Sequence, residues 1–237
     1  MNKDILVCGV GGQGTVLASK LIASAAMNCG NTVHSAETIG MAQRGGSVTS
    51  HIRIGEEAYS PLIPKGNADI ILAFEPAEAV RNLAYLKKGG IVIANCVPVK
   101  PVTESLQNTG YDGRQMVEYL KDRGDCLIID AEEICRPFHS SRYFNAVILG
   151  AAAGSGRLGL KAEALLDAME AGVREEYVTI NKQAFMAGLE AGKRYAAEWD
   201  TDCADRRTGK KAGEDGQLLW KIVSRNGNNR DWQSGRF

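Results

Sequence analysis

The most constraining feature of the sequence is a short apolar segment that runs directly into a cluster of glycines. Residues Ile5 to Cys8 are apolar, and the next six residues are Gly9-Val10-Gly11-Gly12-Gln13-Gly14. A helical pattern follows from Gln13 to Asn28. A buried strand, a glycine turn and a helix in this order are typical of an α/β fold with a parallel sheet. Such a turn points free backbone N–H groups at a ligand, which favours anions.

Apolar and amphipathic segments continue the α/β order along the chain. The segments interpreted as further buried strands are 32–35, 70–74, 91–96 and 126–130, and those interpreted as helices are 77–86, 114–123, 145–153, 161–171 and 181–198. Val48 to Ile54 instead alternates apolar and polar residues, which predicts a half-solvated strand, and we expect Ala58 to Ser60 to return beside it as a hairpin. The sequence therefore predicts an α/β fold with a doubly wound, mostly parallel, Rossmann-like sheet, an inserted β-hairpin and a helical C-terminal part.

The 237 residues divide by composition into a domain and a tail. Residues 1–198 have the apolar content of one large domain. Residues 199–237 are mostly polar, and from Thr201 to Lys211 they are interpreted as a linker. The one apolar island in the tail, Leu218 to Val223, is expected to dock on this chain or on a partner.

Charge and hydropathy exclude several classes of function. Lys and Arg together number 28, as do Asp and Glu, so no net charge favours nucleic acid or an anionic membrane. No apolar run is long enough to cross a bilayer, and the N-terminus lacks a signal-peptide pattern, so a cytoplasmic location is expected. The six cysteines form no Cys-x-x-Cys pair and the three histidines lack metal-ligand spacing, so no metal site is expected.

The glycine turn has the Gly-x-Gly-x-x-Gly spacing of dinucleotide-binding proteins. Glu37, 23 residues beyond Gly14, lies close to where such proteins place an acid that binds a ribose. The spacing alone leaves two interpretations open, a site for NAD or FAD and a tight turn that needs glycine only for its backbone. Gln13 adds no charge, and its amide can hydrogen-bond either a ligand or a neighbouring loop.

A second glycine-containing loop, Gln43-Arg44-Gly45-Gly46, is expected beside the first one. An arginine between small residues can reach across a cleft, and its guanidinium suits a carboxylate or a phosphate. The alternative is an arginine on a solvated loop. Glu75 and Asp130 each end a strand at the same edge of the sheet, where each either lines a site or caps a helix. No residue is identified as catalytic.

Several ordered motifs carry a resemblance to a known family. They are Gly9 to Gly14, Glu37 to Val48, Tyr59-Ser60-Pro61-Leu62-Ile63-Pro64 and Phe74-Glu75-Pro76. Together they resemble the gamma-type domain of the 2-oxoacid:ferredoxin oxidoreductases over about residues 1 to 197. The tail departs from the family.

The resemblance implies a reaction that needs a partner. A 2-oxo acid such as indolepyruvate is decarboxylated on thiamine diphosphate, electrons pass through 4Fe-4S clusters to ferredoxin, and coenzyme A takes the acyl group. The family places thiamine diphosphate and the clusters in an alpha subunit, and ferredoxin contacts this chain only indirectly. The residues expected to face the cofactor or coenzyme A are Gly9, Gly11, Gly12, Gln13, Gly14, Gln43, Arg44, Gly45, Gly46 and Glu75. A stand-alone NAD(P)-dependent dehydrogenase and a nucleotide-sensing module are the alternatives.

Overall fold

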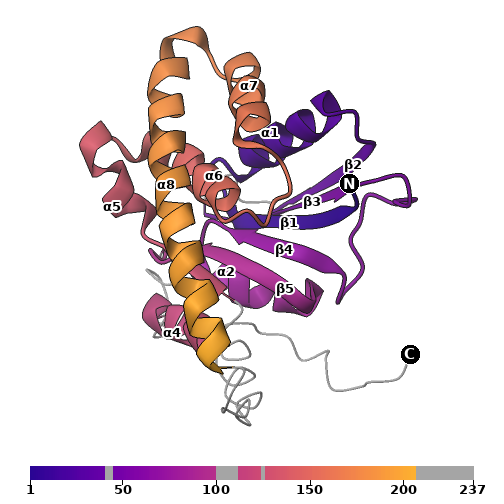
Figure 1. Ribbon diagram of the computed structural model, residues 1–237, viewed down its shortest axis with the longest axis vertical. Coiled ribbons are helices and arrows are strands. Elements are labelled where there is room, and N and C mark those ends of the chain that lie inside the picture. Colours follow the sequence, from indigo (N-terminus) through magenta and orange to yellow (C-terminus); the bar gives the residue numbers. More distant parts are fainter. Residues whose placement is uncertain (41–44, 100–111, 124–125, 207–237) are drawn as a thin grey trace.

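A six-stranded sheet lies at the centre of the computed structural model, which describes residues 1–40, 45–99, 112–123 and 126–206 (Figure 1). The strands are β1 (Lys3–Val10), β2 (Val33–Ile39), β3 (Ser47–Ile54), β4 (Ala68–Ala73), β5 (Leu86–Asn95) and β6 (Cys126–Ile129). They are arranged in the order β2-β3-β1-β4-β5-β6. Strands β1, β4, β5 and β6 run parallel, whereas β3 is antiparallel to both of its neighbours. The predicted α/β fold with a mostly parallel sheet is confirmed.

The inserted hairpin is present, but the predicted pairing of its strands is wrong. Strand β3 pairs with β2 on one side and with β1 on the other, and Ala58 to Ser60 form no strand. The alternation in β3 fits this central position, because Ile52 and Ile54 enter the core while Arg53 stays half-buried. Strand β2 is thereby displaced to the edge of the sheet, one strand away from β1.

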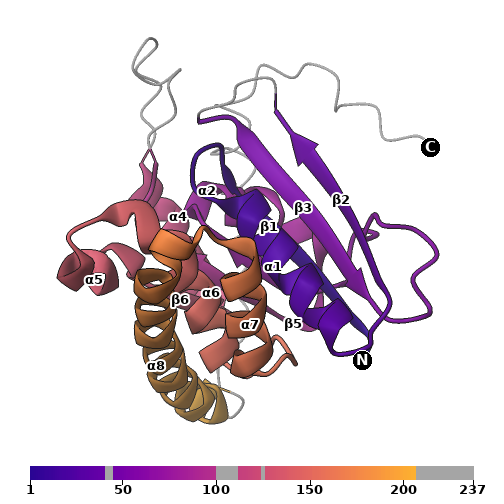
Figure 2. The same ribbon diagram turned by 90° about the horizontal axis from the view of Figure 1, so that it is seen from above.

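Helices cover both faces of the sheet, as Figure 2 shows from above. One face carries α1 (Thr15–Asn28), α5 (Ala131–Cys135), α6 (Phe144–Gly154), α7 (Ala162–Gly172) and α8 (Glu175–Arg206). The other face carries α2 (Pro76–Arg81) and α4 (Gly113–Arg123). Short 3₁₀ turns form η1 (Leu83–Tyr85), η2 (Arg136–Phe138) and η3 (Ser141–Tyr143). The predicted helix 77–86 is therefore shorter, since it ends at Arg81 and a 3₁₀ turn follows.

Strand β1 contributes side chains to both layers of the core. Ile5 and Val7 face the layer of α1 and α6, whereas Leu6 and Cys8 face the layer of α2 and α4. All four side chains are fully buried. Burying an aliphatic side chain of this size contributes about 1.5–3 kcal/mol, so this strand anchors the turn that follows it.

Helices α6 and α8 pack with their backbones in contact. A Cβ atom at Gly150 would lie 2.0 Å from the carbonyl oxygen of Phe185, and one at Gly188 would lie 2.1 Å from that of Val147. Gly154 and Gly192, one turn further along each helix, are equally close to the facing backbone. Four glycines thus let the two helices approach more closely than any side chain allows.

Helix α8 continues to Arg206, past the expected end of the domain at 198 and into the segment interpreted as a linker. Residues 207–237, including the island from Leu218 to Val223, lie outside the described residues. None of the described helices combines the length and hydrophobicity that crossing a bilayer requires.

Candidate functional site

The glycine turn connects β1 to α1 through two residues with positive φ. Gly12 has φ of 100° and Gly14 has φ of 79°, a region that residues with a side chain rarely adopt. Gly14 is the N-cap of α1, and the side chain of Asn145, at the start of α6, lies within 2.9 Å of where a Cβ of Gly14 would be. The predicted order of strand, glycine turn and helix is confirmed.

The side chain of Gln13 closes the turn onto strand β4. Its Oε1 accepts a hydrogen bond from the backbone N–H of Val10 at 2.9 Å, and its Nε2 donates to the carbonyl oxygen of Phe74 at 3.1 Å. The Gln13 amide was expected to hydrogen-bond either a ligand or a neighbouring loop, and in the structure it bonds to groups of the chain itself. Gln13 therefore links the ends of β1 and β4.

This link occupies the position where open α/β sheets usually bind ligands. The chain leaves β1 toward β2 on one side, and β4 lies on the other, so the strand order reverses between β1 and β4. A Cβ at Gly9 would meet Gln13 Oε1 at 2.7 Å and Phe74 Cβ at 2.9 Å. The Phe74 ring in turn packs edge-to-face on Phe144, with centroids 5.6 Å apart. The chain's own side chains thus fill this junction.

The second loop is hydrogen-bonded to the first one through the backbone. Gly11 N–H donates to the carbonyl oxygen of Gly46 at 2.8 Å, and Gly45 N–H donates to that of Gly11 at 3.2 Å. These bonds extend the β1–β3 pairing beyond the ends of the strands. Gln43 and Arg44 lie outside the described residues, so their part in the site stays a prediction.

Glu75 is placed beside the turn as expected, but its carboxylate caps a helix. Glu75 Oε2 accepts a hydrogen bond from the backbone N–H of Glu78 at 2.9 Å, and the residue is 2% exposed. Glu78 is buried as well, and it accepts a hydrogen bond from Ser47 Oγ at 2.6 Å and pairs with Arg81. These contacts tie the start of β3 to the start of α2, next to the second loop.

Burial raises the pKa of the Cys8 thiol well above its ordinary value, and the nearby carboxylates of Glu78 and Glu75 raise it further. Cys8 therefore stays a neutral thiol in the core and is not an activated nucleophile.

Glu37 lies in the wrong place for a ribose-binding acid. Because β3 separates β2 from β1, Glu37 pairs with Ser50, and Ser50 pairs with Val7. Two interstrand spacings put Glu37 about 10 Å from β1. Glu37 is exposed, and its carboxylate accepts a long hydrogen bond, 3.4 Å, from Ser19 Oγ. The geometry gives the dinucleotide interpretation no support.

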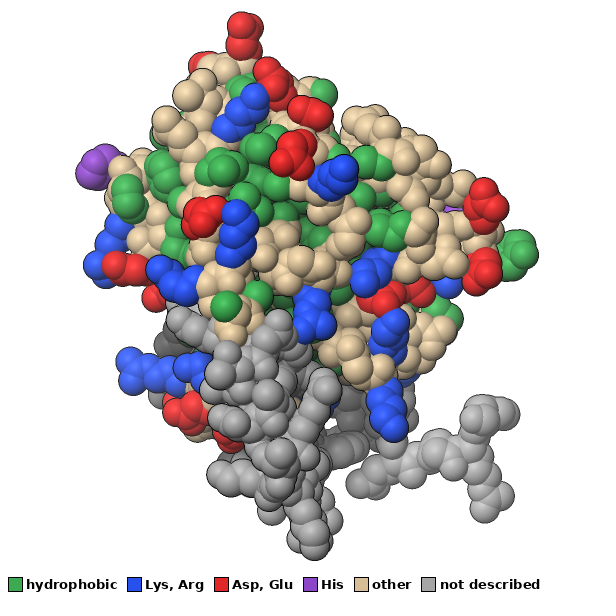
Figure 3. All heavy atoms as spheres, viewed as in Figure 1, with side chains coloured by type: hydrophobic (Ala, Val, Ile, Leu, Met, Phe, Trp, Pro, Cys, Tyr) green, Lys and Arg blue, Asp and Glu red, His purple; other side chains and the backbone are tan. Residues whose placement is uncertain are grey.

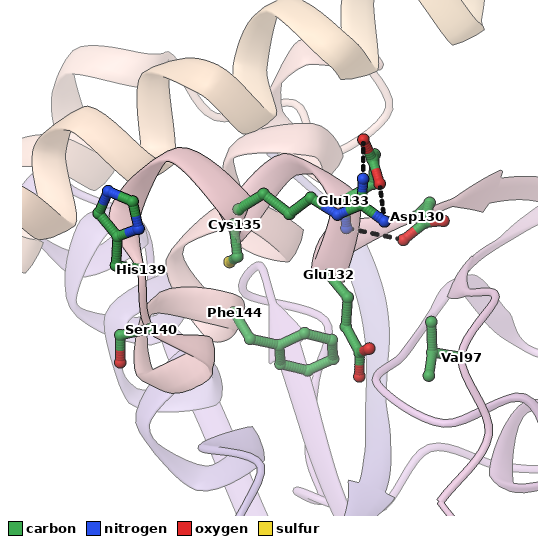
Figure 4. A pocket seen from close by; sticks show the side chains of 9 residues that line it. Val97, Asp130, Glu132, Glu133, Cys135, His139, Ser140 and Phe144 are labelled. Atoms are coloured by element: carbon green, nitrogen blue, oxygen red, sulfur yellow. Dashed lines mark hydrogen bonds and ion pairs between the residues drawn. The ribbon is translucent and has the colours of Figure 1, made fainter.

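A cavity of about 480 Å³ lies beyond the carboxyl ends of β5 and β6 (Figure 4). It is lined by Val97, Asp130, Glu132, Glu133, Cys135, Arg136, His139, Ser140 and Phe144. Asp130 Oδ1 caps α5 through the backbone N–H of Glu133 at 2.9 Å, and Glu133 pairs with Arg136 at 2.9 Å. Of these residues only Asp130 was singled out by sequence, because only it directly follows a strand.

Cys135 lines this cavity and Cys96 precedes the lining residue Val97, and the pKa of each thiol is raised. Burial, with Asp130 nearby, raises the pKa of Cys96 to about 11. Burial, with Glu132 nearby, likewise raises the pKa of Cys135 to about 11. Within the part of the chain that the structure describes, no three His, Cys, Asp or Glu side chains come together as a metal site.

Comparison with known proteins identifies the family. Residues 4–191 match the family model described as pyruvate ferredoxin/flavodoxin oxidoreductase. The chain belongs to this family. The two glycine loops and the Glu75 cap all lie within the matched residues of this oxidoreductase domain.

Several relatives match the domain over nearly their whole length. The chain is 36% identical over 193 residues to the indolepyruvate oxidoreductase subunit IorB of Pyrococcus horikoshii, covering 80% of this chain and 96% of that protein. It is 38% identical to the subunit of the same name from Methanothermobacter thermautotrophicus, covering 81% and 98%.

Two solved structures share the fold. The gamma subunit of a keto/oxoacid ferredoxin oxidoreductase from Geobacter sulfurreducens has a TM-score of 0.58 at 23% identity and covers 81% of this chain and 99% of that one. A 2-oxoglutarate:ferredoxin oxidoreductase from Magnetococcus marinus has a TM-score of 0.60 at 20% identity. There the match covers 83% of this chain but only 31% of the longer chain, so the same fold also occurs as one part of a larger protein.

Proposed function

We propose that this chain is the small subunit of a 2-oxoacid:ferredoxin oxidoreductase that decarboxylates indolepyruvate or another arylpyruvate oxidatively. The products are an acyl-coenzyme A, CO₂ and reduced ferredoxin. The observation that carries the proposal is the identity of 35–38% to four IorB subunits across at least 94% of their lengths. The pyruvate/ketoisovalerate relatives are less similar, at 29–31% identity.

The part of the chain that the structure describes offers no group of side chains that fits an iron–sulfur cluster. Cys8, Cys29, Cys96, Cys126 and Cys135 are spread out along the sequence, and the described residues include no metal-binding group. We therefore assign thiamine diphosphate and the 4Fe-4S clusters to an alpha subunit that binds this chain. Thiamine diphosphate supplies carbanion stabilisation where it is bound.

The end of the sheet with the two glycine loops is the face we propose to lie against the partner's active site. Gly9, Gln13 and Glu75 hold this end together through internal contacts. Gly12 is exposed, and none of the described residues has an atom within 4 Å of where its Cβ would be, so a partner's backbone can approach it closely. Residues 15–18, the first turn of α1, include no acidic side chain, which leaves the positive end of the helix dipole available to a phosphate of coenzyme A. Arg44 is proposed to bind that phosphate or a carboxylate of the partner.

The proposed domain is 1–198, in agreement with the family match to 4–191. Residues 199–237 are proposed as a partner-docking tail, and α8 leads from the domain into it as far as Arg206.

Co-expression with a large subunit that carries thiamine diphosphate and iron–sulfur clusters tests the proposal. We expect a stable complex that reduces ferredoxin with indolepyruvate and coenzyme A, and does so faster than with pyruvate or 2-oxoglutarate. The isolated chain is expected to be inactive. Failure to form a complex, together with tight NADH binding by the isolated chain, would instead support a dehydrogenase or a nucleotide sensor.

Arg44→Ala in the assembled complex tests the role of the second loop. We expect the complex to form while the KM for coenzyme A rises or turnover falls. Normal assembly with an unchanged KM and unchanged turnover would remove Arg44 from the site.

A further inference from the structure

The loop between β3 and β4, residues 55–67, is irregular in secondary structure but is tied to the sheet by side chains. Arg53 Nη1 donates to the carbonyl oxygen of Ser60 at 3.1 Å, while Arg53 Nε pairs with Asp4 at 2.9 Å. The backbone N–H of Ile63 donates to His51 Nδ1 at 3.2 Å. Two side chains of β3 thus hold the middle of the loop against one face of the sheet.

The loop is stiffened from within as well. Ser60 Oγ accepts a hydrogen bond from the backbone N–H of Leu62 at 3.3 Å, and Pro61 and Pro64 fix their own φ angles. Ile63 is 2% exposed and serves as the apolar anchor of the loop. The conformation is therefore set before any partner binds.

This stiff loop directs two large apolar side chains into solvent. Tyr59 is 95% exposed and Leu62 is 55% exposed, on either side of the Ser60–Pro61 pair. The loop projects from the right-hand edge of the molecule in Figure 1, and Figure 3 shows hydrophobic and acidic side chains at the same projection. Glu56 and Glu57, at the start of this loop, are both exposed. Preorganised aromatic and aliphatic side chains of this kind are typical of the centre of a protein interface.

The neighbouring edge strand β2 is only partly covered on the same face, where His34 and Ala36 are half-buried. By strand register, His34 and Ala36 of β2 lie beside Arg53 and His51, the residues that hold the loop. Helices α2 and α4 cover β1, β4, β5 and β6 on this face, and β2 makes its main contacts with β3 and α1, which lies on the opposite face. Among the described elements, no helix covers the β2–β3 end here, so a partner can reach both this end and the loop.

We infer that Tyr59 and Leu62 are the apolar centre of the surface that docks on the large subunit of the oxidoreductase. This inference rests on the proposed function. The choice of partner is supported by the four IorB relatives, each of which is named as a subunit of an indolepyruvate oxidoreductase. The complementary surface on the large subunit is an apolar pocket with Lys or Arg at its rim, opposite Glu56 and Glu57.

Binding of the full-length chain to the purified large subunit tests this surface. We expect the double variant Tyr59→Ser/Leu62→Ser to raise Kd by about 30-fold or more, the effect of losing a binding hot spot. The melting temperature of the isolated chain is expected to stay unchanged, because both side chains are exposed. Tyr177→Ser, at a tyrosine 37% exposed in the first turn of α8, is the matched control and is expected to bind as the wild type does.

The possible outcomes separate this inference from the proposed function. If the wild-type chain binds and the double variant binds equally well, the docking surface is wrong while the function stands. If the wild-type chain does not bind a large subunit at all, the proposed function fails. Sedimentation of the isolated chain provides a further check: a wild-type dimer that the double variant converts to a monomer would make a second copy the occupant and overturn the inference.

Discussion

Glycines are concentrated in two regions of the molecule, the contact between α6 and α8 and the turn between β1 and α1, and they act differently in each. Gly150 and Gly188 are helical residues that leave no room for a side chain, because the facing backbone would lie about 2 Å from a Cβ. Gly12 has open space above it, and its positive φ is what excludes other residues. In the helix contact, glycine is required because the facing backbone leaves no space for a side chain. In the turn, glycine is required because of the positive φ angle.

The difference shows why glycine spacing is a weak guide to ligands. Helices α6 and α8 each contain Gly-x-x-x-Gly, and the turn contains Gly-x-Gly-x-x-Gly. The glycines of the helical pattern serve only to let the two helices pack closely. Within the turn, Gly9 behaves like the helical glycines, since Gln13 and Phe74 occupy the space of its missing side chain. Gly12 is the turn glycine with space for an approaching molecule.

The largest effect is expected at the helix contact. Gly188→Ala places a methyl group about 2.1 Å from the carbonyl oxygen of Val147, so α6 and α8 must separate and the protein should lose about 3 kcal/mol of stability. Urea unfolding measures the loss. Gln183→Ala, at an exposed position of the same helix, is the control. A cost below about 1 kcal/mol would show that the two helices can move apart freely.

A smaller effect is expected at the link between β1 and β4. Gln13→Ala removes both hydrogen bonds of the amide and leaves the partly buried Val10 N–H and Phe74 carbonyl without it, which should cost about 2 kcal/mol. Gln13→Glu keeps an acceptor for Val10 but sets a carboxylate against the Phe74 carbonyl, so it should not restore stability. Unchanged unfolding of Gln13→Ala would indicate that this side chain is kept for a ligand instead.

Gly12→Ala should affect function more than stability. Its backbone conformation is strained for alanine by about 1 kcal/mol, and no neighbouring atom obstructs the methyl group. If a partner or a coenzyme A phosphate approaches this point, turnover of the assembled complex should fall well beyond what the lost stability explains. If the Gly12→Ala complex has full turnover at saturating coenzyme A, the turn has a structural role and does not contact coenzyme A or the partner's active site.

The smallest effect is a pH dependence at the β3–β4 loop. Burial lowers the pKa of His51 from its model-peptide value of 6.5, so the folded protein favours the neutral ring that accepts the Ile63 N–H. Between the lowered pKa and 6.5 the unfolded chain binds more protons, and stability therefore decreases as the pH falls through this window. Unfolding free energies at pH 7.5 and 5.5 measure the decrease. His51→Asn keeps an acceptor but does not titrate, so an equal decrease in this variant would assign the effect to another group.

The sequence predicted most of the strands and helices, but it did not predict which strands pair with each other. The strand and turn from Ile5 to Gly14 were predictable because a buried run and glycines with positive φ leave few alternatives. The pairing of Val48 to Ile54 was not, since a period of two identifies a strand without naming the strands beside it. The hydrogen bond from Gln13 to strand β4 could not be predicted either, because the accepting carbonyl of Phe74 lies 61 residues away along the chain.

Glu37 shows that sequence spacing is equally insufficient for predicting a functional residue. Its distance from Gly14 along the sequence fits a ribose-binding acid, and only the insertion of β3 moves it away from β1. Asp130 and Glu75 were correctly placed at strand ends, but whether such a carboxylate caps a helix or lines a site depends on the nearest backbone N–H. Arg44 lies outside the described residues and stays a prediction.

The backbone bonds that join Gly11 to Gly45 and Gly46 have a mechanical consequence. Because they continue the ladder between β1 and β3, the two loops cannot be displaced independently without breaking sheet hydrogen bonds. A displacement of one loop is therefore transmitted to the other and along β3, past His51 in the middle of the strand, to Arg53 near its far end. The paired strands β1 and β3 thus connect the two ends of this oxidoreductase subunit, with the glycine loops at one end and the exposed Tyr59 near the other.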